Sequence, residues 1–196
     1  QGDMLVTCAT IAQSFMLVVT MPLGGISGGT QTILGYNYGA GKITRVQQAQ
    51  KKIFLLCLVY NVFMTGVAWF GGTWFVRLFT DDPEVTSTAL WALRVCTLSL
   101  LPLGIQYEIV DGFTAIGQVQ FSLPLSFWRK LVYFSALFLL PAAFGARAAF
   151  YAEPISDFLG PAVSMGIHFF FMKRVLHKRR QVSVASSSLE ASQGEW

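Results

Sequence analysis

Charged residues are scarce in this chain of 196 residues. Asp, Glu, Lys and Arg together make up 12% of it, about half of the roughly 25% that is usual in a soluble domain. Histidine occurs twice and cysteine three times, and the sequence has no CxxC, HExxH or Gly-x-Ser-x-Gly pattern. Zinc sites and nucleophilic hydrolases need such spacings. We therefore predict that the chain is not an enzyme and has neither a metal site nor an organic cofactor.

The few cysteines and histidines have ordinary surroundings. Cys8, Cys57 and Cys96 all lie inside apolar runs, and we interpret them as buried free thiols. His168 stands among Phe residues and His177 in a basic segment, so we expect both to be satisfied or solvated. No basic residue precedes the first apolar run, which argues against a secretory signal peptide.

Apolar residues, by contrast, make up 54% of the chain, and its mean hydropathy is +0.54. A helix needs about 20 mainly apolar residues to cross a bilayer, and the sequence shows no alternating pattern of the kind found in membrane barrels. We predict an all-α, polytopic membrane protein, with one transmembrane bundle over residues 1–178 and a disordered, Ser-rich cytoplasmic tail over residues 179–196. The five predicted spans are residues 4–36, 53–78, 87–115, 121–143 and 149–173.

The charges between the spans predict an orientation. Basic residues gather after the first and fifth spans, whereas Asp81, Asp82 and Glu84 make the loop after the second span acidic. By the positive-inside rule, the basic loops and the C-terminus are cytoplasmic. Topology thus explains the pI of about 9.1, and we expect no nucleic-acid partner. Five spans then place the N-terminus outside, so we expect that the chain is the end of a longer protein that supplies upstream helices.

Residues 21–46, MPLGGISGGTQTILGYNYGAGKITRV, are unusual for any protein. Two interleaved pairs of small residues, Gly24–Gly28 and Gly25–Gly29, favour close approach of another helix in lipid. Pro22 precedes them and is expected to kink the helix. The polar residues that follow, close to the membrane edge, need a partner or a water-filled cavity.

Five segments in this order resemble the C-terminal half of multidrug and toxic compound extrusion (MATE) transporters, over helices 8 to 12. Besides residues 21–46, they are RLFTDDPEV at 77–85, LPLGIQYEIVDGFTAIGQ at 101–118, LPLSFWRKLVYF at 123–134 and EPISD at 153–157. The resemblance implies most of one six-helix bundle of a two-bundle transporter in the plasma or inner membrane. It also implies export of small organic cations in exchange for protons or sodium ions, with a fragment that is inactive without the missing N-terminal half.

A related superfamily offers a second function, a flippase for lipid-linked oligosaccharides. Such a flippase is expected to have a more cationic central cavity, which binds phosphate. The few basic residues within the predicted spans argue against it.

Two carboxylates lie inside the third span. Glu108 and Asp111 are three residues apart, on one helix face. An ionisable group at membrane depth costs about 2.5–3.5 kcal/mol on insertion scales, so both are candidates for the site that binds the coupling ion. The alternative is that they cap a wetted helix end or pair with a nearby Lys or Arg. In some MATE proteins a cation-binding aspartate lies further toward the outer side of this helix, where this chain has LPLGIQ and no acid.

Four uncharged polar residues are further candidates for the substrate or ion pathway: Gln31, Tyr36, Asn37 and Gln106. Each can line a cavity, or each can form a hydrogen bond that packs one helix against another.

Several charged residues are candidates for structural ion pairs. Arg129 is expected either to pair with one of the two acids of the third span or to snorkel to the headgroups. Arg94 is expected to pair with the acidic loop or with Asp157, or else to snorkel. Glu153 and Asp157 are four residues apart near the start of the fifth span. We favour a structural role for these acids at the positive end of the helix dipole.

Overall fold

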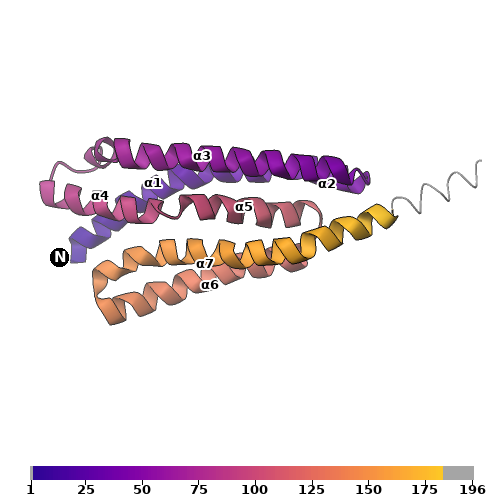
Figure 1. Cartoon of the computed structure of the whole chain (residues 1–196). Coiled ribbons are helices and arrows are strands. Elements are labelled where there is room, and N and C mark those ends of the chain that lie inside the picture. The colour runs from indigo at the N-terminus through magenta and orange to yellow at the C-terminus, as the bar shows by residue number, and fades with distance from the viewer. Residues whose placement is uncertain (1, 183–196) are drawn as a thin grey trace, which may run out of the picture.

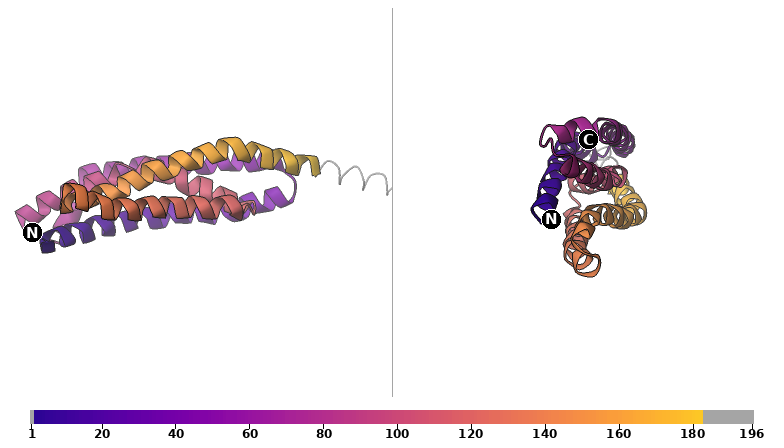
Figure 2. Two further views of the ribbon diagram at one scale, coloured as in Figure 1. Left: turned by 90° about the horizontal axis from the view of Figure 1, so that it is seen from below. Right: turned by 90° about the vertical axis from the view of Figure 1, so that its left-hand side faces the viewer.

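The computed structural model describes residues 2–182 as an elongated helical bundle, with no strand in that range (Figure 1). The elements are α1 (Gly2–Gly29), α2 (Gln31–Gly39), α3 (Ile43–Arg77), α4 (Pro83–Thr97), α5 (Leu100–Ala115), α6 (Val119–Phe144), η1 (Ala146–Tyr151), α7 (Ala152–Ile167) and η2 (His168–Met172). The helix of α7 continues through η2, a π-helical turn, as far as Val182. All the long helices run along the same axis (Figure 2).

The predicted all-α membrane fold is confirmed, and of the five predicted spans the structure has four or five. Four helical stretches are long and apolar enough to cross a membrane on their own: Gly2–Gly39, Ile43–Arg77, Val119–Phe144 and Ala146–Val182. The helices α4 and α5, bent by 43° at a short break, are together long and apolar enough for a fifth span if the pair crosses as one unit.

Two predicted boundaries differ from the structure. The second span begins at Ile43 rather than at residue 53, because the polar segment before its apolar run is also helical. The last helix runs on to Val182, so residues 179–182 belong to it and not to a tail. The rest of the predicted tail, residues 183–196, lies outside the described residues.

Glycines form the tight turns between helices. Gly41 follows α2, Gly117 follows α5 and Gly145 follows α6, with φ of 70°, 74° and 86°. These positive φ values are readily available only to glycine. The start of α4 is fixed by an N-cap instead of a glycine: the side chain of Asp82 accepts a hydrogen bond of 2.8 Å from the backbone N–H of Glu84. This cap and the proline at the next position, Pro83, fix where α4 begins.

The bend in the third span has a simple cause in the sequence. Pro102 lies in the first turn of α5 and has no N–H, so the carbonyl of Leu98 cannot receive its usual helical hydrogen bond. The continuous helix ends at Thr97 and resumes at Leu100. In the first span, by contrast, the helix runs on past Pro22 and is interrupted at Thr30.

At the glycine pairs the described residues show one contact, at Gly24, where a Cβ would be 3.7 Å from Cε1 of Tyr107, an ordinary van der Waals distance to a side chain and not the predicted approach of a helix backbone. No atom outside the local helix lies within 4 Å of the position that a Cβ would occupy on Gly25, Gly28 or Gly29. The close approach is at Gly35 instead, where a Cβ would be 2.9 Å from the carbonyl oxygen of Ala115. Glycine there lets α2 lie directly against the end of α5.

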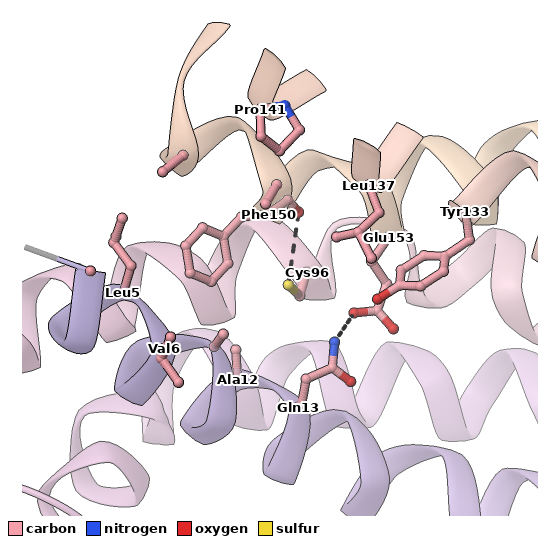
Figure 3. A pocket seen from close by; sticks show the side chains of 14 residues that line it. Leu5, Val6, Ala12, Gln13, Cys96, Tyr133, Leu137, Pro141, Phe150 and Glu153 are labelled. Atoms are coloured by element: carbon pink, nitrogen blue, oxygen red, sulfur yellow. Dashed lines mark hydrogen bonds between the residues drawn. The ribbon is translucent and has the colours of Figure 1, made fainter. Parts of the chain in front are cut away.

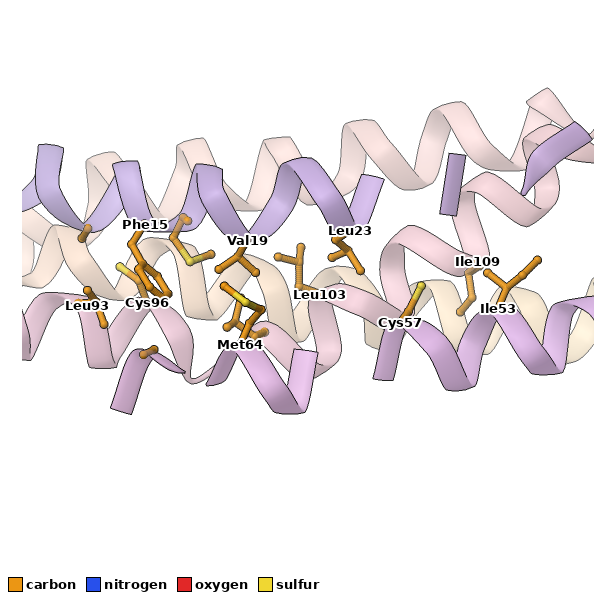
Figure 4. Close-up of a cluster of buried hydrophobic side chains, with 14 of the residues drawn as sticks. Phe15, Val19, Leu23, Ile53, Cys57, Met64, Leu93, Cys96, Leu103 and Ile109 are labelled. Carbon is orange, nitrogen blue, oxygen red and sulfur yellow. The ribbon is translucent and has the colours of Figure 1, made fainter. Parts of the chain in front are cut away.

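The apolar core lies where α1, α3 and the bent span meet (Figure 4). Phe15, Val19 and Leu23 of α1 face Met64 of α3 and residues of α4 and α5. The three cysteines are buried and free, as predicted. Many large apolar side chains instead point outward, including Phe70, which is 94% exposed. Outward aromatic and aliphatic side chains are what a bilayer solvates.

The two ends of the bundle differ in charge. We call the end that carries the α2–α3 turn and the end of the α7 helix the basic end, because Lys42, Arg45, Lys51 and Lys173 lie near it. At this end the guanidinium of Arg179 donates to the carbonyl oxygens of Tyr38 at 3.2 Å and of Gly39 at 2.6 Å. The opposite end carries the acidic α3–α4 loop and the α6–η1 turn.

Candidate functional site

Asp111 of α5 lies in a polar cluster with the first span. Ser27 of α1 donates its hydroxyl hydrogen to Oδ2 of Asp111, and Nε2 of Gln31 in α2 donates to Oδ1 at 2.9 Å. The structure thus brings together two of the predicted pathway residues. Ser27 was not predicted; the signal was its position four residues before Gln31, which places both on one helix face.

Glu108 faces another part of the bundle. Its side chain is 5% exposed and lines a cavity of about 690 Å³ between α3 and η2. Gln50 of α3 and His168 of η2 line the same cavity. Within the described residues no hydrogen bond reaches the Glu108 carboxylate, whereas Asp111 accepts two. The two acids therefore have different surroundings although they share one helix.

The other three pathway candidates do not join either carboxylate. Tyr36 is 72% exposed, and Asn37 donates to the carbonyl oxygen of Ile33 in its own helix at 2.8 Å. Gln106 is buried and accepts a hydrogen bond from the hydroxyl of Ser164 in α7. Of these three, Gln106 alone forms a hydrogen bond between the side chains of two helices, as in the packing alternative.

The ion pair of the described residues joins Arg129 and Asp157, at 2.8 Å between Nη1 and Oδ1. The prediction that Arg129 pairs with an acid of the third span is therefore wrong. Asp157 is fully buried and also accepts a hydrogen bond of 3.3 Å from the Ser99 hydroxyl, at the break between α4 and α5. A Cβ on Gly160 would be 2.9 Å from Cγ of Arg129, so glycine leaves room for the arginine stem.

Arg94 does not pair with Asp157 in this arrangement. Its guanidinium carbon instead lies 5.9 Å from the centre of the Trp69 ring in α3, a cation–π contact. Arg129 rather than Arg94 lies beside Asp157, because α6, which carries Arg129, forms an antiparallel hairpin about Gly145 with α7, which carries Asp157. The sequence could not show which arginine the hairpin places beside the acid.

Glu153 lies in a second cavity, of about 510 Å³, between α1, α6 and the start of α7 (Figure 3). Its carboxylate accepts a hydrogen bond of 2.7 Å from Nε2 of Gln13 in α1. Tyr133 and Phe150 contribute aromatic rings, and the remaining walls are mostly apolar: Leu5, Val6, Ala12, Leu137 and Pro141. Glu153 is also in the first turn of α7, the position on which the predicted dipole role depends.

Residues 2–139 match the MatE protein family. The multidrug export protein MepA of Staphylococcus haemolyticus (strain JCSC1435) is 26% identical over 152 residues, which cover 77% of this chain and 33% of MepA. MepA of Staphylococcus aureus (strain MSSA476) is 24% identical over 151 residues, which cover 77% of this chain and 33% of that protein.

Solved structures agree with this match. A crystal structure of MATE in the bent conformation superposes with a TM-score of 0.80 at 16% identity, covering 94% of this chain and 40% of that one. The Vibrio cholerae MATE transporter VcmN in the bent form gives 0.77 at 18% identity, covering 91% and 40%. The chain belongs to the MatE family, whose matched members are membrane transporters rather than enzymes. It spans 33% of the length of the curated relatives it matches.

Proposed function

We propose that the chain is the C-terminal bundle, helices 8–12, of a secondary-active antiporter that exports organic cations in exchange for protons or sodium ions. The observation that carries the proposal is the carboxylate pair of the bent span, Glu108 and Asp111, placed within the apolar length of the bundle. An ionisable side chain within a membrane span costs free energy, and such side chains typically occur where a protein binds or moves ions. The related MepA proteins are named multidrug export proteins.

The Glu153 cavity suits the cargo. An organic cation has a positive charge on an apolar body, and this cavity offers one carboxylate among aromatic and aliphatic walls. Its volume of about 510 Å³ lies within the range of about 300–1,000 Å³ typical of small-molecule sites. Tyr133 and Phe150 can hold such a cation over a ring face.

The Asp111 cluster suits the coupling ion. When ionised, Asp111 accepts from Ser27 and Gln31; when protonated, it carries an O–H of its own and cannot accept both in the same way. Protonation at Asp111 therefore changes the contact between the first span and α5. A sodium ion can act at the same place, through the carboxylate and neighbouring oxygens, with the same effect on this contact.

Alternating access requires two bundles that move about a shared site, so the partner of this chain is the N-terminal bundle of the same transporter. We place the protein in the plasma or inner membrane, with the basic end and the C-terminus in the cytoplasm, because basic loops are retained on that side.

The test uses the two-bundle transporter in cells that lack their own drug pumps, with ethidium accumulation as the measurement. We expect the wild type to lower accumulation. Asp111→Asn should reduce the efflux rate about tenfold or more, since coupling energies are typically about 1–3 kcal/mol, and should leave membrane insertion normal. Thr114→Val, which removes an exposed polar group from the same helix, is the matched control and should transport normally.

Two results would count against the proposal. An inserted wild type that changes the accumulation of no dye in a broad panel favours the flippase. If Asp111→Asn, Glu108→Gln and the double variant all transport at the wild-type rate at every pH, these acids do not couple transport.

A further inference from the structure

The Glu108 cavity surrounds one of the two carboxylates on which the export scheme rests, and its lining includes Gln50, Lys51, Phe54, Glu108, His168 and Met172. It lies between α3 and η2, on the side of α5 away from the contact of Asp111 with α1. Two lysines, Lys51 and Lys173, line it toward the basic end. Its deepest charged group is Glu108, which is 5% exposed.

Three polar groups of this cavity lack partners among the described residues. Nε2 of Gln50 and Nδ1 of His168 are buried atoms without a hydrogen bond, and the Glu108 carboxylate has none either. Gln50 is 8% exposed as a whole. A buried donor or acceptor left unsatisfied costs about 1–3 kcal/mol, and more when charged. A ligand that can both donate and accept hydrogen bonds removes this cost for the two buried atoms of Gln50 and His168, and it also gives the Glu108 carboxylate a partner.

The backbone around Glu108 keeps the space open. A Cβ on Gly112 would be 3.1 Å from Nε2 of Gln50 and 3.8 Å from Oε1 of Glu108, so its absence leaves a gap between these groups. On the facing side, the helix takes a π-helical turn over His168–Met172. Single π-turns in helices occur frequently at functional sites, and this one directs His168 and Met172 into the cavity.

We propose that the Glu108 cavity is a hydrated proton-binding site that opens at the basic end and connects Glu108 with the cytoplasm. Water fits because it donates and accepts, and because the cavity, although most of its lining surface is apolar, presents Gln50, Glu108 and His168 as partners for it. The orientation and the link to export rest on the proposed function. A hydronium ion in the cavity transfers one proton to the Glu108 carboxylate, leaving water and a neutral carboxylic acid, and the reverse step returns the proton.

The two acids of α5 then have separate duties. Asp111 exchanges protons on the side of the first span, and Glu108 exchanges them with the cytoplasm. The ionisable groups that face Glu108 come from its own helix and from both walls: Asp111, Lys51, Cys57, His168 and Lys173. Arg129 and Lys130 of α6 lie beside Asp111, on the side of α5 away from the Glu108 cavity.

The hydration of the cavity is tested by cysteine labelling of the two-bundle transporter in inside-out vesicles. Gln50→Cys and His168→Cys are made separately, with Cys8, Cys57 and Cys96 replaced by Ala. A charged, membrane-impermeant methanethiosulfonate is the probe, because only a hydrated thiol ionises and reacts. The control is Phe63→Cys, on the same helix as Gln50 and exposed on the apolar surface. We expect both cavity positions to react about tenfold faster or more than the control.

If the protein without its native cysteines fails to insert, the test can still be made. Gln50→Cys and His168→Cys are then compared in the chain that keeps the native cysteines, because these thiols are buried. Reaction at neither cavity position, or reaction only from the outer face in right-side-out vesicles, overturns the proposal. An acyl chain filling the cavity gives the first of these results.

The proton route is tested separately by transport. Gly112→Ala should slow proton-driven efflux several-fold and Gly66→Ala, which meets no atom within 4 Å, should not. If the cavity is labelled but Gly112→Ala and Glu108→Gln both keep the wild-type pH profile, the route is refuted. If the wild type itself exports nothing, the proposed function fails while the labelling result still decides the hydration.

Discussion

The pair of Arg129 and Asp157 allows a quantitative prediction for the α6–α7 hairpin. We expect Arg129→Met to destabilise the protein by leaving Asp157, which is fully buried, without its counter-ion. Removing one partner of a buried pair costs about 3–5 kcal/mol. The Arg129 side chain is 20% exposed and the Ser99 hydroxyl still donates to Asp157, so we place the loss at or below the lower limit of this range, at about 2–3 kcal/mol. This corresponds to about a 30- to 150-fold change in the unfolding equilibrium.

The measurement is unfolding of the purified transporter in mild detergent, followed by helical circular dichroism. Lys130→Met is the matched control, because it removes the neighbouring positive charge from an exposed side chain and should change stability little. The double variant Arg129→Met with Asp157→Leu should regain most of the lost stability, since it removes the buried charge as well. Wild-type stability of Arg129→Met, or a double variant less stable than the single one, would refute the reasoning.

Two further predictions concern packing and cargo. Gly35→Ala should cost about 1–3 kcal/mol, since overpacking against a backbone atom forces the helices apart, whereas Gly66→Ala should be neutral or slightly stabilising; both are measured by the same unfolding assay. Glu153→Gln keeps a hydrogen-bond partner for Gln13 but removes the charge, so efflux of cationic dyes should fall several-fold while that of a neutral substrate of similar size changes less. An equal fall in efflux for the cationic dyes and for the neutral substrate would show that Glu153 only supports the fold.

Hydropathy was sufficient for the type of the helices and for four of the five spans, because a bilayer sets both the length and the composition of a span. It could not locate the bend between Thr97 and Leu100, since a proline in an apolar run can open a helix, kink it or be tolerated. In this chain Pro102 removes the helical hydrogen bond to the carbonyl of Leu98, and the helix opens one turn before it. Ser99, in the break, donates to the buried carboxylate of Asp157, a contact with α7 that hydropathy does not show.

The candidate site was predicted less completely than the fold. The free-energy cost of burying a charge identified Glu108 and Asp111 as candidates. Gln31 was predicted as a separate pathway residue, and the structure places it in a hydrogen bond with Asp111. Gln50 gave no signal, because it lies in a polar stretch before the predicted second span and becomes buried only because α3 begins early. His168 was expected to be satisfied or solvated, but the structure leaves its Nδ1 buried without a partner among the described residues.

The contact of Arg179 with the end of α2 has a practical consequence for anyone who shortens or tags this protein. The last carbonyls of a helix lack partners within it, and those of Tyr38 and Gly39 are bound by a side chain 140 or more residues later in the chain. A version cut after residue 178, where a boundary drawn from hydropathy would fall, removes a cap from a different helix. A chain that ends beyond Val182 keeps both helix ends joined.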